Sequence, residues 1–220
     1  MSWSDIFYNN VERREKLCRL SQSLLEKMKN NFRATNKLST VLNENFNCKF
    51  ETITLDEGKT VKENCNVFLE AVRKIQAKIE EIDRRLKEKL EPSCYQEILK
   101  LRNPSTGHLR TIQNALHGVV SLATVAGAGV LIHLIKNGGV LANISSRVAR
   151  VAAGFFGCLA ISALGLGIDM LLGAICGMIE KSKLDEAIRE YERVLEDFGP
   201  ASDNYYDTIM MVTFKLEEWV

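Results

Sequence analysis

The residues with the most chemical potential in this chain do not fall into a recognised catalytic pattern. Its three histidines are His108, His117 and His133, and none lies in a His-Glu-x-x-His sequence of the metalloprotease type. A Gly-x-Ser-x-Gly nucleophile turn is also missing from the sequence. We therefore expect a protein that is not an enzyme, with no catalytic, cofactor-binding or metal-binding residue and no cofactor.

The cysteines favour structural thiols over a redox or zinc site. None of the six belongs to a Cys-x-x-Cys pair, and two lie in the most apolar part of the chain. A disulfide framework or a zinc site requires closer or regularly spaced cysteines. We predict reduced and mostly buried thiols at Cys18, Cys48, Cys65, Cys94, Cys158 and Cys176.

A short stretch, Gly58-Lys59-Thr60, looks like the end of a phosphate-binding loop. Such a loop needs a glycine five positions before Gly58, where this chain has Ile53, and the carboxylates of Asp56 and Glu57 would repel phosphate. We expect no nucleotide binding. The net charge of +1 and the lack of a basic patch with interleaved aromatics argue against nucleic acid as well.

One acidic residue stands out, because Asp169 is a lone carboxylate within an apolar stretch. At the centre of a bilayer it would cost ~2.5–3.5 kcal/mol, so it must pair, face a cavity or lie near an interface. One interpretation is a channel or proton-relay acid. We favour a polar contact to His117 or His133, or a position at the end of a span, since no second acid or basic relay partner accompanies it.

The strongest signal in the sequence is an apolar block. Residues 111–179 contain only four charged side chains, and residues 111–135 and 151–168 contain none. A helix of roughly 18–20 apolar residues spans the hydrocarbon of a bilayer. We predict a membrane-associated helical hairpin over residues 108–179, with the lipid bilayer as partner; a glycine-rich hairpin buried in a soluble bundle is the alternative.

The two apolar runs are joined by a polar segment. Lys136-Asn137-Gly138-Gly139 predicts a turn, because paired glycines break a helix and supply positive φ. The basic residues that follow, Arg147 and Arg150, are expected to face water or phosphate headgroups. Small residues at four-residue steps, such as Ala149, Ala153 and Gly157, favour close helix packing in lipid.

Residues 1–103 read as a helical hairpin. An apolar stripe of four-three spacing predicts a coiled-coil seam of about four heptads that stops near residue 90, because Pro92 disfavours helical geometry before it. A looser stripe over residues 11–46 predicts its partner helix. Between them, residues 50–58 predict a short extended piece or small hairpin with a turn. The seam residues are Val61, Cys65, Phe68, Val72, Ile75, Ile79, Ile82 and Leu86.

The last segment, residues 180–220, predicts two amphipathic helices outside the membrane. The first carries Leu184, Ile188 and Tyr191 on one face and should end at Gly199-Pro200, while the second repeats the four-three spacing from Tyr205 onward. These helices are expected to pack on the N-terminal pair and complete an α-bundle.

The expected topology contains a conflict. No secretory signal precedes the first helix, which places both termini in the cytosol, and the basic join also prefers the cytosolic side. Two full crossings cannot satisfy both. Either one run crosses alone, or the pair is a re-entrant or stored hairpin, which the glycine-rich faces favour.

Several stretches in chain order give the sequence a family likeness from about residue 13 to residue 206. They are Thr35-Asn36-Lys37-Leu38, Lys62-Glu63-Asn64-Cys65, Lys89-Leu90-Glu91-Pro92, Leu164-Gly165-Leu166-Gly167-Ile168-Asp169-Met170 and Ala187-Ile188-Arg189-Glu190-Tyr191-Glu192. In these the chain resembles the single-pass membrane and coiled-coil domain-containing proteins. The resemblance implies a membrane protein with a coiled coil, one crossing near residues 155–175 and no catalytic residue to transfer.

We therefore expect an all-α protein with a long N-terminal coiled-coil hairpin, a central apolar hairpin and two C-terminal amphipathic helices. The leading functional hypothesis is a non-enzymatic, membrane-anchored interaction or scaffold module that binds a protein partner or itself through its helices. The alternative is a soluble bundle that inserts its apolar hairpin into membranes, as pore-forming proteins do. A purely soluble adaptor is a third interpretation.

Overall fold

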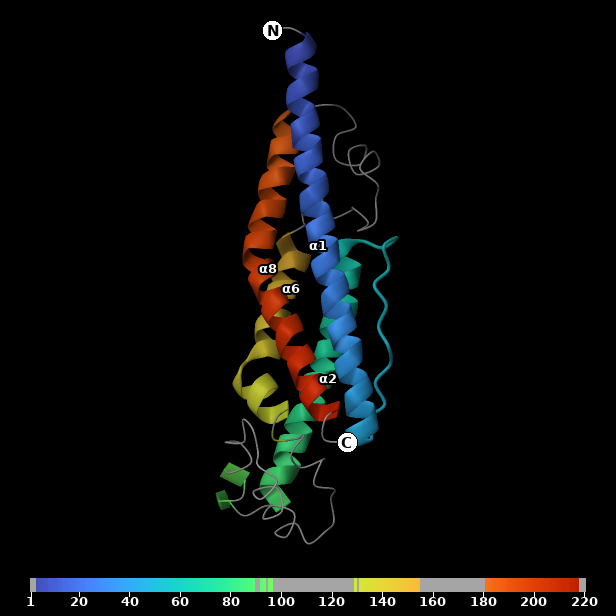
Figure 1. Cartoon of the computed structure of the whole chain (residues 1–220), viewed down its shortest axis with the longest axis vertical. Helices are drawn as coiled ribbons and strands as arrows, with labels where there is room; N and C mark the ends of the chain where they lie inside the picture. Colours follow the sequence, from blue (N-terminus) through green and yellow to red (C-terminus); the bar gives the residue numbers. More distant parts are fainter. Residues whose placement is uncertain are drawn as a thin grey trace. The chain divides into compact units, whose positions relative to one another are not determined.

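The computed structural model describes residues 3–89, 92–93, 95–96, 129, 131–154 and 181–217 (Figure 1). Over these residues the chain forms four α-helices and a short π-helical segment, with no strand. The elements are α1 (Trp3–Phe46), α2 (Val61–Lys89), η1 (Ile132–Asn137), α6 (Val140–Gly154) and α8 (Lys181–Glu217). The expected all-α class is confirmed.

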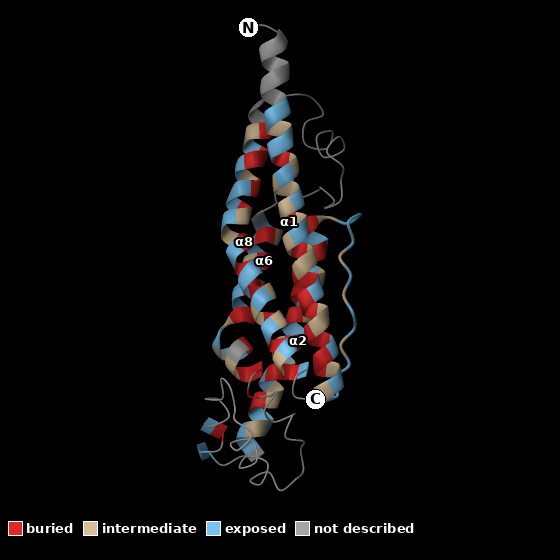
Figure 2. Cartoon of the chain, viewed as in Figure 1, coloured by how far each residue is buried: buried red, intermediate tan, exposed pale blue. Residues whose placement is uncertain are grey.

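Helix α1 follows the predicted stripe and buries it. Every residue of that stripe between Leu17 and Leu42 is at most 4% exposed except Leu20, which is half-buried, and buried residues recur along the helix in Figure 2. The helix ends where Asn47 adopts a φ of 51°, a left-handed conformation that asparagine tolerates better than most residues. The buried stripe is Leu17, Leu24, Met28, Phe32, Leu38, Val41 and Leu42.

The connection between α1 and α2 is held by asparagine side chains. Asn36 donates to the carbonyl of Ile53 at 2.8 Å and accepts from its N–H at 2.9 Å, and Asn43 makes the same pair of bonds with Phe50 at 3.0 and 2.8 Å. The two asparagines are separated by about 10.5 Å along the helix, and three extended residues cover about 10 Å. The two distances match, so both asparagines reach the connection at once. Each amide bonds to the N–H and the carbonyl of one residue, as a neighbouring strand would do.

This arrangement decides between the two structures predicted for the connection. The structure assigns no strand to residues 47–60 and places a turn at residues 57–58. The backbone groups of Phe50 and Ile53 bond to side chains rather than to a second strand. Of the two predicted structures, the small β-hairpin is therefore absent from residues 47–60, and the short piece without a paired strand remains.

Helix α2 begins at a reciprocal cap. The Thr60 N–H donates to the Glu63 carboxylate at 2.9 Å, and the Glu63 N–H donates to the Thr60 hydroxyl at 3.2 Å. The Asn64 side chain also pairs with both backbone groups of Asp56, at 2.9 Å each. The Gly58-Lys59-Thr60 stretch therefore serves helix initiation, as a capping box does, and its geometry is not that of a phosphate loop.

The α2 seam is buried over most of its length. Val61, Cys65, Phe68, Val72, Ile75 and Ile79 are at most 2% exposed, whereas Ile82 and Leu86 are half-buried. Near the C-terminal end of the helix the buried residue is Asp83, at 2% exposure. The mixed charge of Asp83-Arg84-Arg85 predicts a solvated flank of the seam, and for Asp83 this prediction is wrong.

The segment between the two apolar runs is more regular than expected. The turn is present, with Gly139 at a φ of 63°, but the next helix begins at Val140 rather than near residue 151. Five apolar residues of α6 lie on one face and are at most 6% exposed: Val140, Leu141, Ile144, Val148 and Val151. Residues 140–150 thus have an apolar stripe of their own, which their polar residues masked in the sequence.

Helix α8 runs through the point where we had predicted a break. Pro200 lies inside the helix, so one helix occurs here in place of two. Buried side chains occur on both sides of the proline, at Phe198, Ala201 and Tyr205. An interior proline costs ~3 kcal/mol, and burial of two aromatic side chains offsets a cost of this size at about 1.5–3 kcal/mol each.

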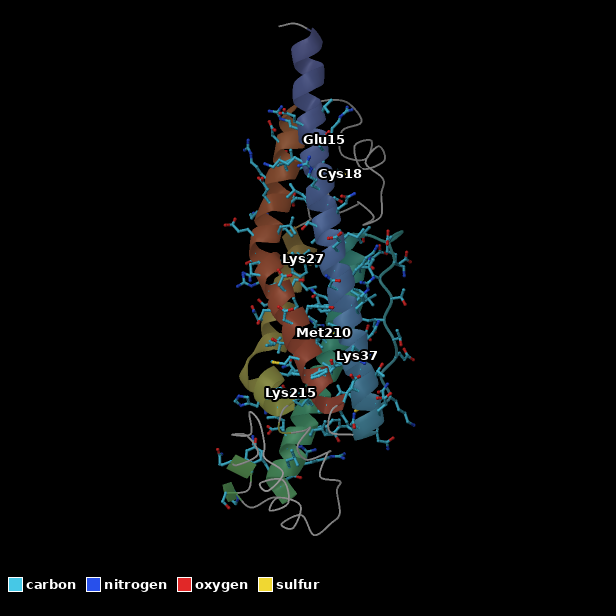
Figure 3. The ribbon with its side chains drawn as sticks, in the orientation of Figure 1. Glu15, Cys18, Lys27, Lys37, Met210 and Lys215 are labelled. Carbon is cyan, nitrogen blue, oxygen red and sulfur yellow. The ribbon has the colours of Figure 1, made fainter. Side chains whose placement is uncertain are left out.

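The chain divides into two compact units, each with its own core. The first comprises Met1–Phe32, Thr54–Leu69 and Ile144–Asp203; its core includes the ring contact of Phe32 with Phe68, whose centroids are 5.7 Å apart. Lys27, labelled in Figure 3, binds Asp203 there at 2.7 Å.

The second unit comprises Arg33–Ile53, Glu70–Asn143 and Asn204–Val220. Its core contains a buried hydrogen bond of 2.8 Å between the hydroxyls of Thr35 and Tyr205. Burial raises the pKa of Tyr205 well above its ordinary value, so the phenol is neutral. Lys37, also labelled in Figure 3, pairs with Glu217.

Candidate functional site

The basic residues between the two apolar runs are all paired with carboxylates. In the first unit, one oxygen of Asp197 in α8 accepts a hydrogen bond from Arg147, and the other forms an ion pair with the Nε of Arg150 at 3.2 Å. We call these three residues the Asp197 cluster. Its side chains are about one-third to one-half exposed, and the shared carboxylate links α6 to α8.

In the second unit, a buried carboxylate gathers three donors. Asp83 of α2 accepts from the hydroxyl of Tyr95, from the ammonium of Lys136 in η1 and from that of Lys87 one turn later on α2, the last at 3.0 Å. The Lys87 ammonium also lies 5.3 Å from the centre of the Tyr95 ring. We call these four residues the Asp83 cluster.

The electrostatics of the Asp83 cluster favour a fixed ion pair over proton transfer. Burial by itself raises the pKa of Asp83, but the hydrogen bonds from Lys136, Tyr95 and Lys87 outweigh it and hold the pKa below the usual value. Hydrogen bonding to Asp83 raises the pKa of Lys87, and burial raises that of Tyr95. At neutral pH the acid is therefore ionised, and Lys87 and Tyr95 keep their protons, which suits a structural role.

Each unit contains a small hollow. One, of about 50 Å³, lies in the second unit beside Lys136, and another of about 10 Å³ lies in the core of the first unit. Sites for small molecules usually have ~300–1,000 Å³. The larger hollow holds about a water or two, and its lining residues are Gln76, Ile79, Glu80, Ile135, Lys136, Gly139, Leu141 and Ala142.

The thiols of the described residues agree in part with the expected buried, reduced cysteines. Cys18, Cys48 and Cys65 are free; Cys65 is 1% exposed, and the other two are half-buried. Burial raises the pKa of Cys65 to about 12, which leaves an inert thiol at neutral pH. Within the described ranges no three side chains of the histidine, cysteine, aspartate or glutamate type are grouped to hold a metal ion.

The sequence identified the basic residues of the join but not their surroundings. These residues were expected to face water or headgroups; Lys136 and Arg150 are indeed exposed, and all three, with Arg147, also bind a carboxylate of a charged helix. Their partners are far away in sequence, and helical periodicity carries no information on such pairs. A signal existed only for Asp83, which lies four residues after Ile79 and so continues the buried face of α2.

Much of the apolar block lies outside the described residues. This applies to residues 111–128 and 155–180, and therefore to Asp169, His117, Cys158 and Cys176; Cys94 is also outside. His133 is half-buried in η1. No helix within the described ranges is long and apolar enough to cross a membrane.

Fold and site together define an all-α protein whose polar helices are tied by carboxylates to the segment between two apolar runs. Comparison with protein families then places it: the chain belongs to the family described as "Protein of unknown function (DUF4533)", which matches residues 13–173. That range includes α1, α2, η1 and α6 from residue 13 onward. No solved structure matches the chain.

Proposed function

We propose that this protein is a non-enzymatic, membrane-associated helical module that acts through protein contacts, as a scaffold or by self-association. Its charged amphipathic helices form the interacting part, and the apolar runs outside η1 and α6, residues 111–130 and 155–168, supply the membrane contact. The termini are on the cytosolic side. Lipid and protein are its partners, with no role for nucleotide, nucleic acid or a cofactor.

The observation that carries this proposal is the contrast between α6 and its flanks. Helix α6 buries an apolar face and pairs both of its arginines, so it is accommodated by the rest of the protein. The stretches before and after it are rich in apolar residues and poor in charge. A long uncharged stretch is the sequence signal by which hydropathy identifies a membrane helix.

The family likeness gives further support. The single-pass membrane and coiled-coil domain-containing proteins, which the chain resembles, are named for a membrane segment and a coiled coil. The α2 seam matches the second feature, since its apolar residues are buried at four-three spacing.

Carbonate extraction of membranes tests the proposal. We expect the wild-type chain to stay in the membrane pellet, and Leu164→Arg or Ile161→Arg to weaken this, because a central arginine adds ~2.5–3.5 kcal/mol to insertion. Ala77→Arg, at an exposed position of α2, is the control and should leave recovery unchanged. Full recovery of the wild-type chain in the soluble fraction without detergent would refute membrane association.

A second candidate is a soluble helical bundle that inserts its apolar runs on a trigger, as pore-forming proteins do. The docking of α6 favours this candidate, because a stored hairpin requires the segment between the two apolar runs to be packed within the protein. Dye release from liposomes separates the two candidates. Release by a chain purified without detergent supports the pore-forming type, and its absence from a carbonate-resistant protein supports the scaffold.

A further inference from the structure

From Ile144 onward helix α6 belongs to the first unit, where two kinds of contact hold it. Ile144, Val148 and Val151 are at most 4% exposed, and the latter two line the cavity that Phe32 and Phe198 also line. Burial of apolar side chains such as these stabilises the docked helix. The Asp197 cluster adds two ion pairs to α8. Separation of α6 from α8 would expose the apolar face and leave Asp197 without these arginines.

The π-helical segment η1 is bound in the second unit. Leu131, Ile132 and Ile135 are at most 1% exposed, although they belong to the end of the first apolar run. Lys136 binds Asp83 of α2, and so does Tyr95, which precedes that run. The carboxylate of Asp83 therefore binds one residue that precedes the first apolar run, Tyr95, and one that follows it, Lys136.

The docking of α6 also shortens the second apolar run. Residues 151–154 belong to α6, and Val151 is buried in the first unit. Fourteen uncharged residues then remain before Asp169. As a helix they would cover about 21 Å, against ~30 Å of bilayer hydrocarbon. A full crossing from the end of α6 would have to carry Asp169 into the membrane.

From these contacts we infer that α6 lies on the same side of the membrane as helices α1, α2 and α8. Each apolar run then leaves and returns on that side, and the chain makes no net crossing. This inference rests on the proposed membrane association and names its mode. It replaces the single crossing that the family likeness implies. If either run crossed the membrane alone, α6 would lie on the other side of the membrane from helices with which it is in contact.

Cysteine labelling on the full chain tests the sidedness of α6. Five native cysteines are replaced by alanine or serine, and Cys65 is kept because its thiol is buried. Single cysteines are placed at exposed positions: Gln22→Cys in α1, Ala77→Cys in α2, Ser146→Cys in α6 and Asn204→Cys in α8. Cells are treated with a membrane-impermeant maleimide before and after selective permeabilisation of the plasma membrane, and after full solubilisation. The parent chain with Cys65 alone gives the background.

We expect all four cysteines to react in the same fraction. A Ser146→Cys chain that reacts only from the side opposite the other three, or only after solubilisation, would overturn the inference while the membrane association stands. Loss of the protein from carbonate-washed membranes would instead overturn the proposed function, and the inference with it. The two failures are read from different measurements.

The wild-type chain provides a second test without any new cysteine. Asn143-Ile144-Ser145 is a glycosylation sequon in α6, and the Asn143 side chain is exposed. On the cytosolic side it meets no oligosaccharyl transferase, so we expect no change in gel mobility on treatment with a glycosidase in mammalian cells. A glycosidase-sensitive shift that Asn143→Gln abolishes would place α6 in the lumen and overturn the inference.

Discussion

At the scale of single residues, Asp83 shows how a polar side chain takes a core position. It is 2% exposed on a helix whose other buried residues are apolar apart from Asn64, and three donors satisfy it. A buried carboxylate is tolerated only when it is paired and hydrogen-bonded. The sequence around it, Asp83-Arg84-Arg85, has the mixed charge of a solvated surface, which is why its burial was not predicted.

Removal of this carboxylate should be costly. Asp83→Asn keeps the size but loses the charge that two lysines bind, and we expect a loss of about 1–3 kcal/mol in the free energy of unfolding, because both lysines reach solvent and limit the damage. Glu88→Gln is the matched control: Glu88 pairs with Arg84 on the exposed face of α2, where such pairs contribute ~0–0.5 kcal/mol. Denaturant titration measures both, and equal effects would contradict the role of Asp83.

The same residue predicts a pH dependence. Its pKa in the folded protein is below that of the unfolded chain, ~3.9, so the stabilisation is complete above that value and is lost as the pH falls through the folded pKa. The difference in melting temperature between the wild type and Asp83→Asn should therefore be constant from neutral pH to about pH 5 and shrink below about pH 4. A constant difference down to pH 3 would show that charge is not the cause.

At the scale of elements, the apolar periodicity predicted the helices well, because burial of one face is the main source of their stability. The apolar periodicity failed to predict two helix boundaries, because other interactions determine them. The start of α6 at Val140 was missed because Asn143, Ser145 and Ser146 interrupt the apolar pattern, and the continuation of α8 past Pro200 was missed because proline is a local signal that packing outweighs.

The α2 seam gives a direct prediction. Ile75 and Ile79 are at most 1% exposed, and Ile79 lines the hollow that Ile135 and Leu141 also line, so it packs beyond the N-terminal hairpin that we had predicted as its surroundings. Ile75→Ala and Ile79→Ala should each lower the free energy of unfolding by ~2–5 kcal/mol. Glu80→Ala, at an exposed position next to Ile79, should change it by less than ~0.5 kcal/mol. Comparable losses of unfolding free energy in all three variants would show that the buried face of α2 is assigned to the wrong residues.

The asparagine pairs along the α1–α2 connection are testable in the same way. Asn36→Ala and Asn43→Ala each remove two hydrogen bonds to the backbone of the connection, at about 1 kcal/mol per bond. We expect faster tryptic cleavage after the exposed Lys49 in both variants. Asn45→Ala is the control, since its amide bonds to a carbonyl of its own helix, Val41. Cleavage that accelerates equally in the control would show that the asparagine pairs do not hold the segment.

At the scale of the whole molecule, the charges of η1 and α6 bear on the membrane topology that we propose. A positive-inside argument treats Lys136, Arg147 and Arg150 as free charges that choose a side of the membrane. In the structure each pairs with a carboxylate from a charged helix, and the two arginines share Asp197, so under the proposed membrane association the side of α6 is set by these partners. Sequence alone could not show this, because the deciding contacts span about fifty residues.

Charge reversal in the Asp197 cluster tests whether this pairing stabilises the docked α6. Asp197→Arg in the wild-type chain brings three arginines together and should lower the free energy of unfolding by about 1–2 kcal/mol, a modest value because the side chains are one-third to one-half exposed. In a chain that carries Arg147→Asp and Arg150→Asp, the same Asp197→Arg change should raise it. This change of sign, measured by denaturant titration of the four chains, isolates the pairing from side-chain size. If Asp197→Arg is equally unfavourable in both backgrounds, the ion pairs do not hold α6, and its docking rests on the apolar face alone.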